Sequence, residues 1–226
     1  MATQTATPVG GSNPARLQVE PASERLLAWI KAHKQAATWI GAVLVVALVL
    51  FVWTLSSNRR SEEIASRELQ GARFAFENKN LPLAASELAR IVENYSGTNA
   101  AQEGRLLLAQ VRLLQGQPQQ AVEVLRDFAP GAGKAFRAQA YGLLGAAYEN
   151  MARPREAAEA YEKGAEEARM DFLKVQLLSD AGRAWTIASE STKAIATYRR
   201  IVKDFPKEGT ATEAKVRLGE LTKGAL

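Results

Sequence analysis

The apolar residues of this chain follow two patterns, one continuous and one periodic. Residues 36–55 form a run of twenty residues without a charge. After residue 60, apolar residues recur at intervals of three and four, as at Leu106, Ala109 and Leu113. That spacing is typical of amphipathic helices, and no strand-like alternation of apolar and polar residues accompanies it. The pattern therefore predicts an all-α chain.

The continuous run predicts a transmembrane anchor at residues 36–55. Twenty helical residues span about 30 Å, the thickness of the hydrocarbon core of a bilayer. Trp39 and Trp53 lie near the two ends, where indoles favour the membrane interface. A buried core helix is one alternative, but such a helix seldom runs this long without a polar face. A cleaved signal peptide is another, but its apolar core is shorter and ends at a small-x-small site. An uncleaved anchor is favoured.

The segment before the anchor divides into two parts. Residues 1–20 are rich in Thr, Gly, Pro and small residues, so we expect a disordered tail. Residues 21–35 are expected to form an amphipathic juxtamembrane helix, or else a simple extension of the anchor. Three basic residues lie close to the anchor on each side, so charge does not decide its orientation. They are Arg25, Lys31 and Lys34 before it, and Arg59, Arg60 and Arg67 after it.

Residues 61–226 are expected to form a tandem repeat domain. Four units align on leading alanines that are 37, 36 and 37 residues apart, at Ala84, Ala121, Ala157 and Ala194. Each unit reads as helix, turn, helix, with inner turns at 78–82, 115–118, 151–154 and 189–192. Prolines in the first three turns would start the second helix, where a missing N–H costs nothing. One hairpin cannot bury its apolar face alone, so the units must stack as a solenoid. Residues 209–226 would form a final solvating helix.

The third and fourth units carry a family resemblance. The third has Tyr141, Leu144, Gly145, Tyr148, Ala157 and Tyr161, and the fourth has Ala181, Gly182, Trp185, Ala194, Tyr198 and Pro206. These residues resemble the tetratricopeptide repeat. Ala72 and Ala109 take the small-residue position in the two degenerate first units. The resemblance implies an α-solenoid of about four degenerate tetratricopeptide-like hairpins and a C-terminal solvating helix, which would follow the single transmembrane helix predicted from the apolar run.

The layout of tail, anchor and degenerate repeats resembles the YfgM-type ancillary subunits of the bacterial Sec translocon. That resemblance implies an inner-membrane protein with a cytoplasmic N-terminus and a periplasmic repeat domain. It also implies the Sec translocon and periplasmic chaperones or secreted chains as partners. Residues 201–206 are similar to repeats of outer-membrane assembly and cell-division coordinator proteins, so an envelope-assembly scaffold is the alternative. Those proteins usually carry a lipidated cysteine or a cleaved signal, whereas this sequence has no cysteine and we expect its apolar run to be uncleaved.

Composition argues against several other functions. The net charge is +5, and the charges are interspersed, which does not suggest nucleic-acid binding. Cysteine is absent, and the single histidine, His33, lies beside the anchor. Residues 130–135 are glycine-rich but fail the phosphate-loop pattern at Phe128 and Ala135, so we expect a turn there. We therefore expect no catalytic residue, cofactor, metal site or small-molecule substrate.

Binding is the function that a helical repeat array offers, through the groove formed by its first helices. The repeat register assigns ten residues to this groove: Leu69, Arg73, Phe76, Leu106, Gln110, Leu113, Gln139, Glu149, Gln176 and Arg183. The first two units would present apolar residues and the last two polar ones. Such a groove could grip an extended or helical peptide with a hydrophobic end. Alternatively, the four apolar residues simply pack against neighbouring helices.

Overall fold

A computed structural model describes residue 23 and residues 31–224 of the chain. The predicted disordered tail and most of the predicted juxtamembrane helix lie outside these residues. Every regular element in the described part is a helix, and no strand is found there. The chain divides into two compact units, Met1–Thr54 and Leu55–Leu226. The all-α prediction is confirmed.

Helix α2 (Lys34–Glu77) contributes residues to both units. In the first unit, the large apolar side chains from Val43 to Trp53 are all more than half exposed, so this stretch is not part of a core formed by the described residues. Among the described residues, one helix is long and apolar enough to cross a membrane, judged by length and composition. The predicted anchor lies in the first half of α2, and the helix continues without a break through residues 56–60.

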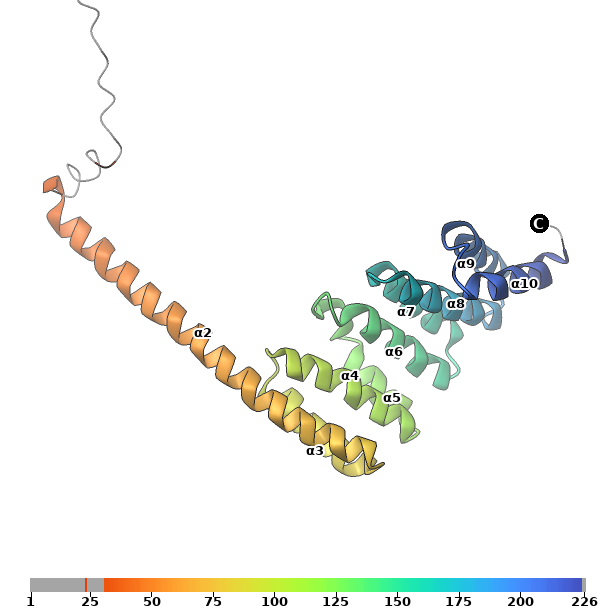
Figure 1. Ribbon diagram of the computed structural model, residues 1–226, viewed down its shortest axis with the longest axis horizontal. Coiled ribbons are helices and arrows are strands. Elements are labelled where there is room, and N and C mark those ends of the chain that lie inside the picture. The colour runs from red at the N-terminus through yellow and green to blue at the C-terminus, as the bar shows by residue number, and fades with distance from the viewer. Residues whose placement is uncertain (1–22, 24–30, 225–226) are drawn as a thin grey trace, which may run out of the picture. The chain divides into compact units, whose positions relative to one another are not determined.

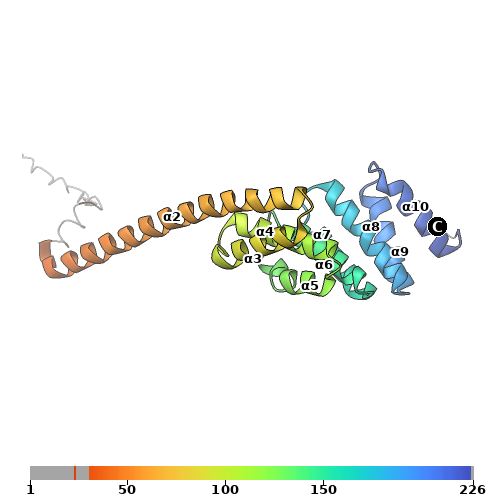
Figure 2. The same ribbon diagram turned by 90° about the horizontal axis from the view of Figure 1, so that it is seen from below.

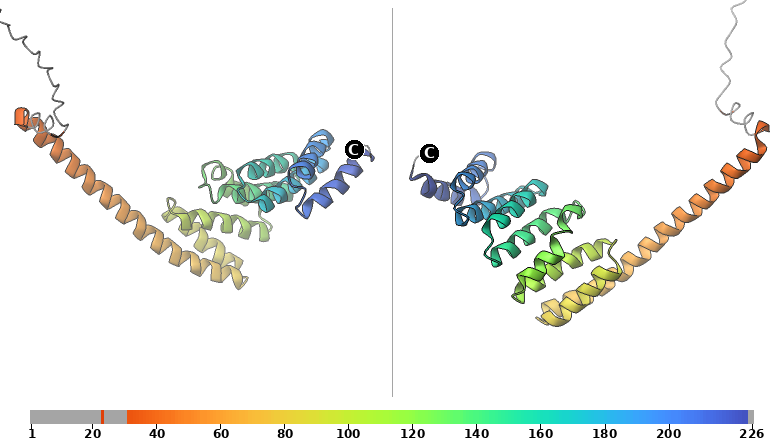
Figure 3. Two further views of the ribbon diagram at one scale, coloured as in Figure 1. Left: turned by 45° about the horizontal axis from the view of Figure 1, so that its top comes forward. Right: turned by 180° about the vertical axis from the view of Figure 1, so that it is seen from behind.

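The second unit contains the predicted hairpins (Figures 1 and 2). The C-terminal part of α2 is the first helix of the first hairpin. The other helices are α3 (Leu81–Asn94), α4 (Asn99–Leu114), α5 (Pro118–Leu125), α6 (Arg137–Asn150), α7 (Pro154–Glu167), α8 (Asp171–Ile187), α9 (Ser191–Asp204) and α10 (Thr210–Thr222). Each second helix packs against the first helix of the next hairpin, from α3 on α4 to α9 on α10. The predicted solenoid of four hairpins and a final helix is confirmed (Figure 3).

The four inner turns share one backbone geometry. Each contains a residue in the left-handed region, with φ of 60° at Lys79, 70° at Gly116, 55° at Ala152 and 61° at Ser189. In each turn the next N–H donates to the carbonyl five residues back, at 2.8–3.0 Å. This is the Schellman geometry, which satisfies carbonyls that the helix end leaves unpaired. Pro118 and Pro154 then begin the second helices of their hairpins, as predicted.

The two helices of a hairpin approach each other at the small-residue position. In the third hairpin a Cβ on Gly145 would lie 2.6 Å from the Tyr161 ring, and in the fourth a Cβ on Gly182 would lie 2.7 Å from the Tyr198 ring. The first two hairpins bury an alanine and a leucine at the corresponding positions: Ala72 with Leu88, and Ala109 with Leu125. In the hairpins where the second helix carries the larger tyrosine, the first helix carries glycine. Where the second helix carries the smaller leucine, the first helix carries alanine.

Helix α5 is the exception among the second helices. It has 8 residues, whereas α3, α7 and α9 have 14 each. Pro130 explains the early end, because its ring disfavours helical backbone at Ala129 and clashes with the carbonyl of Arg126. The chain instead forms the short 3₁₀ helix η1 (Ala129–Gly131) and a turn that leads into α6. The glycine-rich segment 130–135 is thus part of a turn between units, as predicted.

Candidate protein-binding groove

The first helices of the first three hairpins enclose a cleft of about 380 Å³, here called the α2–α4–α6 cleft. Four of the ten predicted groove residues line it: Arg73, Leu106, Gln110 and Gln139. Glu77, Glu103, Leu107 and Phe136 complete its walls. The repeat register therefore brings residues that are far apart in sequence to one concave site.

Two of the predicted groove residues are buried in the core, although one of them, Leu106, also lines the cleft. Leu69 and Leu106 are each only 4% exposed, in the buried clusters around α3 and α5. Phe76 and Leu113 are half-buried and pack against the same two clusters. Of the two alternatives given for these four apolar residues, packing against neighbouring helices is the one that the structure shows. Their side chains point between the helices, because each lies on the face that packs against the second helix of its own hairpin.

The accessible part of this cleft is more polar than apolar. An ion pair joins Arg73 of α2 to Glu103 of α4 across the cleft. Gln110 and Gln139 are exposed, and neither side-chain amide forms a hydrogen bond to another described residue. Each amide offers two donors and an acceptor, which are the groups that pair with the backbone of a bound peptide. The first half of the groove is thus suited to main-chain recognition.

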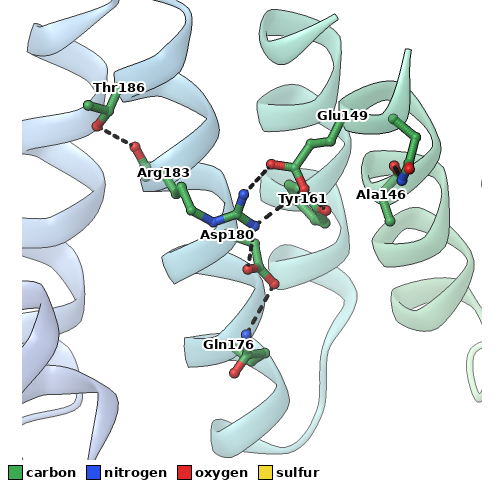
Figure 4. Close-up of polar contacts among 9 residues, drawn as sticks. Ala146, Glu149, Tyr161, Gln176, Asp180, Arg183 and Thr186 are labelled. Atoms are coloured by element: carbon green, nitrogen blue, oxygen red, sulfur yellow. Dashed lines mark hydrogen bonds and ion pairs between the residues drawn. The ribbon is translucent and has the colours of Figure 1, made fainter. Parts of the chain in front are cut away.

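The second half of the groove contains a polar network centred on Glu149 (Figure 4). The Tyr161 hydroxyl donates to the Glu149 carboxylate at 2.7 Å, and Arg183 donates to the same carboxylate from the next hairpin. Arg183 also donates to Asp180 at 3.0 Å, and the Gln176 amide donates to Asp180 at 3.2 Å. Three predicted groove residues, Glu149, Gln176 and Arg183, are therefore already joined to one another.

This network stabilises the neutral form of Tyr161. Burial raises the pKa of the Tyr161 phenol, and the hydrogen bond to the Glu149 carboxylate raises it further. The phenol therefore remains a neutral donor that fixes Glu149 beside Arg183. The arrangement pairs the carboxylates of Glu149 and Asp180 with Arg183.

The final helix also contributes to the groove, which the sequence analysis did not anticipate. A cleft of about 260 Å³ lies between α8, α9 and α10, and Arg217 and Leu221 of α10 line it together with Ile187. Arg217 follows Asp180 by 37 residues, the repeat interval. That spacing indicates that α10 occupies the position of a first helix in the repeat. The prediction that residues 209–226 form only a solvating helix did not include this role.

The described residues contain no group of three His, Asp or Glu side chains arranged to hold a metal. The turn between α5 and α6 is held by protein contacts, because the Gly133 N–H donates to the Gln102 side chain at 2.7 Å.

Comparison with known proteins places the repeats in a family. The model of a tetratricopeptide repeat-like domain matches residues 54–181. A search of curated proteins finds no significant match. Among solved structures, similar ones are the nearly identical TPR-like repeats of a Podosopora anserina protein described as a putative kinesin light chain, and a single-substitution variant of the same repeats. They have identities of 18% and 17% respectively and a TM-score of 0.56, and the match covers 71% of this chain and 87% of theirs. These similarities show the fold alone. The matched family model covers more than half of the chain, so this chain belongs to the tetratricopeptide repeat-like family, whose repeats are protein–protein interaction modules.

Proposed function

We propose that this chain is a non-catalytic binding protein, anchored in the bacterial inner membrane by one helix, whose groove holds segments of other proteins outside the cytoplasm. Its partners would be the Sec translocon and periplasmic chaperones or secreted chains. The observation that carries the binding role is the α2–α4–α6 cleft, in which the unpaired amides of Gln110 and Gln139 face a ligand from neighbouring hairpins.

The membrane anchor is supported by the exposure of α2. The side chains from Val43 to Trp53 would leave a large apolar surface in water, which soluble monomers rarely expose. A bilayer would cover that surface. A helix also satisfies its own backbone hydrogen bonds, as the hydrocarbon core requires.

The translocation role is supported by the layout of the chain, in which a short tail and an anchor precede the repeats. An envelope-assembly or cell-division scaffold is the second candidate, favoured by the Ile-Val-x-x-Phe-Pro segment at residues 201–206. The two roles require the same topology but different ligands for the groove. Topology and groove occupancy are therefore separate tests.

Topology can be tested cleanly because the chain has no native cysteine. Single cysteines would be placed at Ser12 in the tail and at Thr212, which is exposed on α10. A membrane-impermeant maleimide, applied to cells with a permeable outer membrane, should label Thr212→Cys but not Ser12→Cys. The reverse labelling would place the repeats in the cytoplasm and refute the proposal.

Groove occupancy can be tested with a photo-reactive residue at Gln110 or Gln139, and with one at Gln119 of α5 as an exposed control. The probe is a secretory protein arrested during translocation through the Sec machinery. We expect crosslinks to the arrested chain from Gln110 and Gln139 and much less from Gln119. Equal crosslinking at the three positions, or none at all, would contradict a groove that holds secreted chains.

A further inference from the structure

One face of the first hairpin has no covering helix among the described residues, although the same face is covered in every later unit. Each first helix after α2 packs on the second helix of the preceding hairpin. At the position of Phe74, the later units have Val111, Ala147 and Ala184, and all three are fully buried. Phe74 itself is 69% exposed. The repeat therefore places a large aromatic residue at a stacking position that lacks its neighbour.

The same contrast holds along this face. At the position of Ile64, the second unit and the final helix bury Ala101 and Ala211, whereas Ile64 is 46% exposed. Gly71 is also exposed, although the corresponding positions of the later units are all buried: Leu108, Leu144, Ala181 and Leu218. Ile64, Arg67, Gly71 and Phe74 are spaced by three, four and three residues, so they share one side of the helix. We call these four residues the α2 outer face.

The charges on and beside this face are available to a partner. Arg59, Arg60 and Arg67 make no ion pair with a described residue, whereas Arg73 is paired with Glu103. Of the nearby carboxylates, Glu62 accepts the backbone N–H groups of Asn99 and Ala100, and Glu68 lies 3.5 Å from Arg90. Within the described part of α2, only Glu63 and Glu77 remain unpaired against the three arginines. The carboxylate of Glu87, on α3, also makes no ion pair with a described residue and lies beside Gly71. The α2 outer face is therefore basic around Ile64, where Arg60 and Arg67 lie, and acidic beside Gly71.

We infer that the α2 outer face binds an amphipathic helix with acidic residues, supplied by a partner protein, in the place that a preceding second helix would take. A helix is the expected occupant because α3, α5, α7 and α9 cover the equivalent faces of the next four first helices. The partner's apolar side would cover Ile64 and Phe74. Its acidic residues would pair with Arg60 and Arg67. Arg60 lies one helical turn before Ile64, and Arg67 lies one turn after it.

A second copy of this chain fits the face poorly. If both copies are anchored in one membrane, as proposed above, their α2 helices run parallel. Arg67 would then face Arg67 of the second copy, and like charges in contact oppose pairing. This site is also distinct from the groove, so it can fail without affecting the proposed groove ligand.

The test measures whether the α2 outer face is covered in native membranes. A cysteine at Gly71 is suitable because a Cβ there meets only the Glu87 carboxylate, at 3.9 Å. Its maleimide labelling rate would be compared between native membranes and purified full-length chain in vesicles of zwitterionic lipid. We expect labelling about tenfold slower in native membranes, as for a face that is open about one-tenth of the time. Thr192→Cys, exposed on the fourth hairpin, should label equally in both.

Second substitutions in the Gly71→Cys chain then test the chemistry of the occupant. Arg67→Glu or Phe74→Ser should restore fast labelling, and the matched charge reversal Arg199→Glu on α9 should not. Equal rates in native membranes and vesicles would overturn the inference. So would slow labelling in the vesicles, which would mean that lipid covers the face, or a disulfide between two Gly71→Cys chains, which would mean a second copy. If Gly71→Cys still labelled slowly in native membranes after Arg67→Glu, the occupant would not be an acidic helix.

Discussion

The Tyr161 ring occupies the space that a side chain on Gly145 would need, because a Cβ there would lie 2.6 Å from the ring edge. Gly182 and Tyr198 stand in the same relationship one repeat later. Where the second helix carries leucine, as at Leu88 and Leu125, the first helix carries alanine. The two positions therefore form a matched pair that sets how closely the helices of each hairpin approach.

Gly145→Ala should destabilise the protein by about 1–3 kcal/mol, because the added methyl group overlaps a buried ring. Adding Tyr161→Leu should recover part of this loss, since the pair then matches the first two hairpins. The measurement is the urea midpoint of the full chain in detergent, followed by circular dichroism. Gly219→Ala is the control, because its Cβ would meet nothing within 4 Å. Equal effects of the two alanine substitutions would contradict the matched pair.

The inner turns predict substitutions that stabilise the protein. Ala152→Gly and Ser189→Gly should each raise stability by up to about 1 kcal/mol, because glycine avoids the steric cost of left-handed backbone. Gly116→Ala should lower it by a similar amount, since its φ is 70°. Thermal melting of the three variants would check this. A lower melting temperature for Ala152→Gly than for the parent chain would contradict the left-handed backbone conformation of this residue.

Tyr161 predicts a loss of stability at alkaline pH. Burial, and then the hydrogen bond to Glu149, raise the pKa of the Tyr161 phenol in the folded state. The folded chain therefore holds this proton more tightly than the unfolded chain. Its contribution is complete below about pH 10, the ordinary tyrosine pKa, and is lost as the pH rises above that value.

The urea midpoint should therefore fall between about pH 10 and pH 11, and Tyr161→Phe should reduce the fall. The reduction should be partial, because burial also raises the pKa of Tyr198. Tyr141→Phe serves as a control tyrosine substitution. A decline that is unchanged by Tyr161→Phe would exclude Tyr161 as its source.

Glu62 predicts a local effect at the start of α4. Its carboxylate accepts the N–H groups of Asn99 at 2.7 Å and Ala100 at 2.9 Å. A negative charge at a helix N-terminus is favourable, so Glu62→Gln should cost about 0.5–1 kcal/mol. Hydrogen exchange at these two amides should accelerate, while Glu63→Gln, on an exposed neighbour, should leave them unchanged. Unaltered exchange in Glu62→Gln would mean that the contact contributes little.

The hairpins could be predicted from the sequence because each repeat requires a small residue at the same buried position. Ala84, Ala121, Ala157 and Ala194 are all fully buried, so no larger residue fits and their spacing survives in otherwise degenerate units. The early end of α5 was not predicted, since the register suggests a helix of the same length in every unit. Pro130 was the local signal, and it outweighs the repeat pattern because it acts on the backbone itself.

The groove could be predicted only in part. Arg73, Gln110 and Gln139 line one cleft, as the register suggests, because it fixes which side of each helix a residue occupies. It could not give the burial of Leu69 and Leu106, which depends on how closely the neighbouring helices approach. The contact between Glu149 and Arg183 joins two hairpins and depends on the rotation from one repeat to the next, which sequence spacing does not supply.

The short α5 has a mechanical consequence. A stacked array resists bending through the contacts that its second helices make with the following units, and at α5 this wall has little more than half the length of the others. The array should therefore bend most easily at this hairpin. Because the α2–α4–α6 cleft spans the same units, flexing at α5 would change the width of the cleft and let it clasp segments of different thickness.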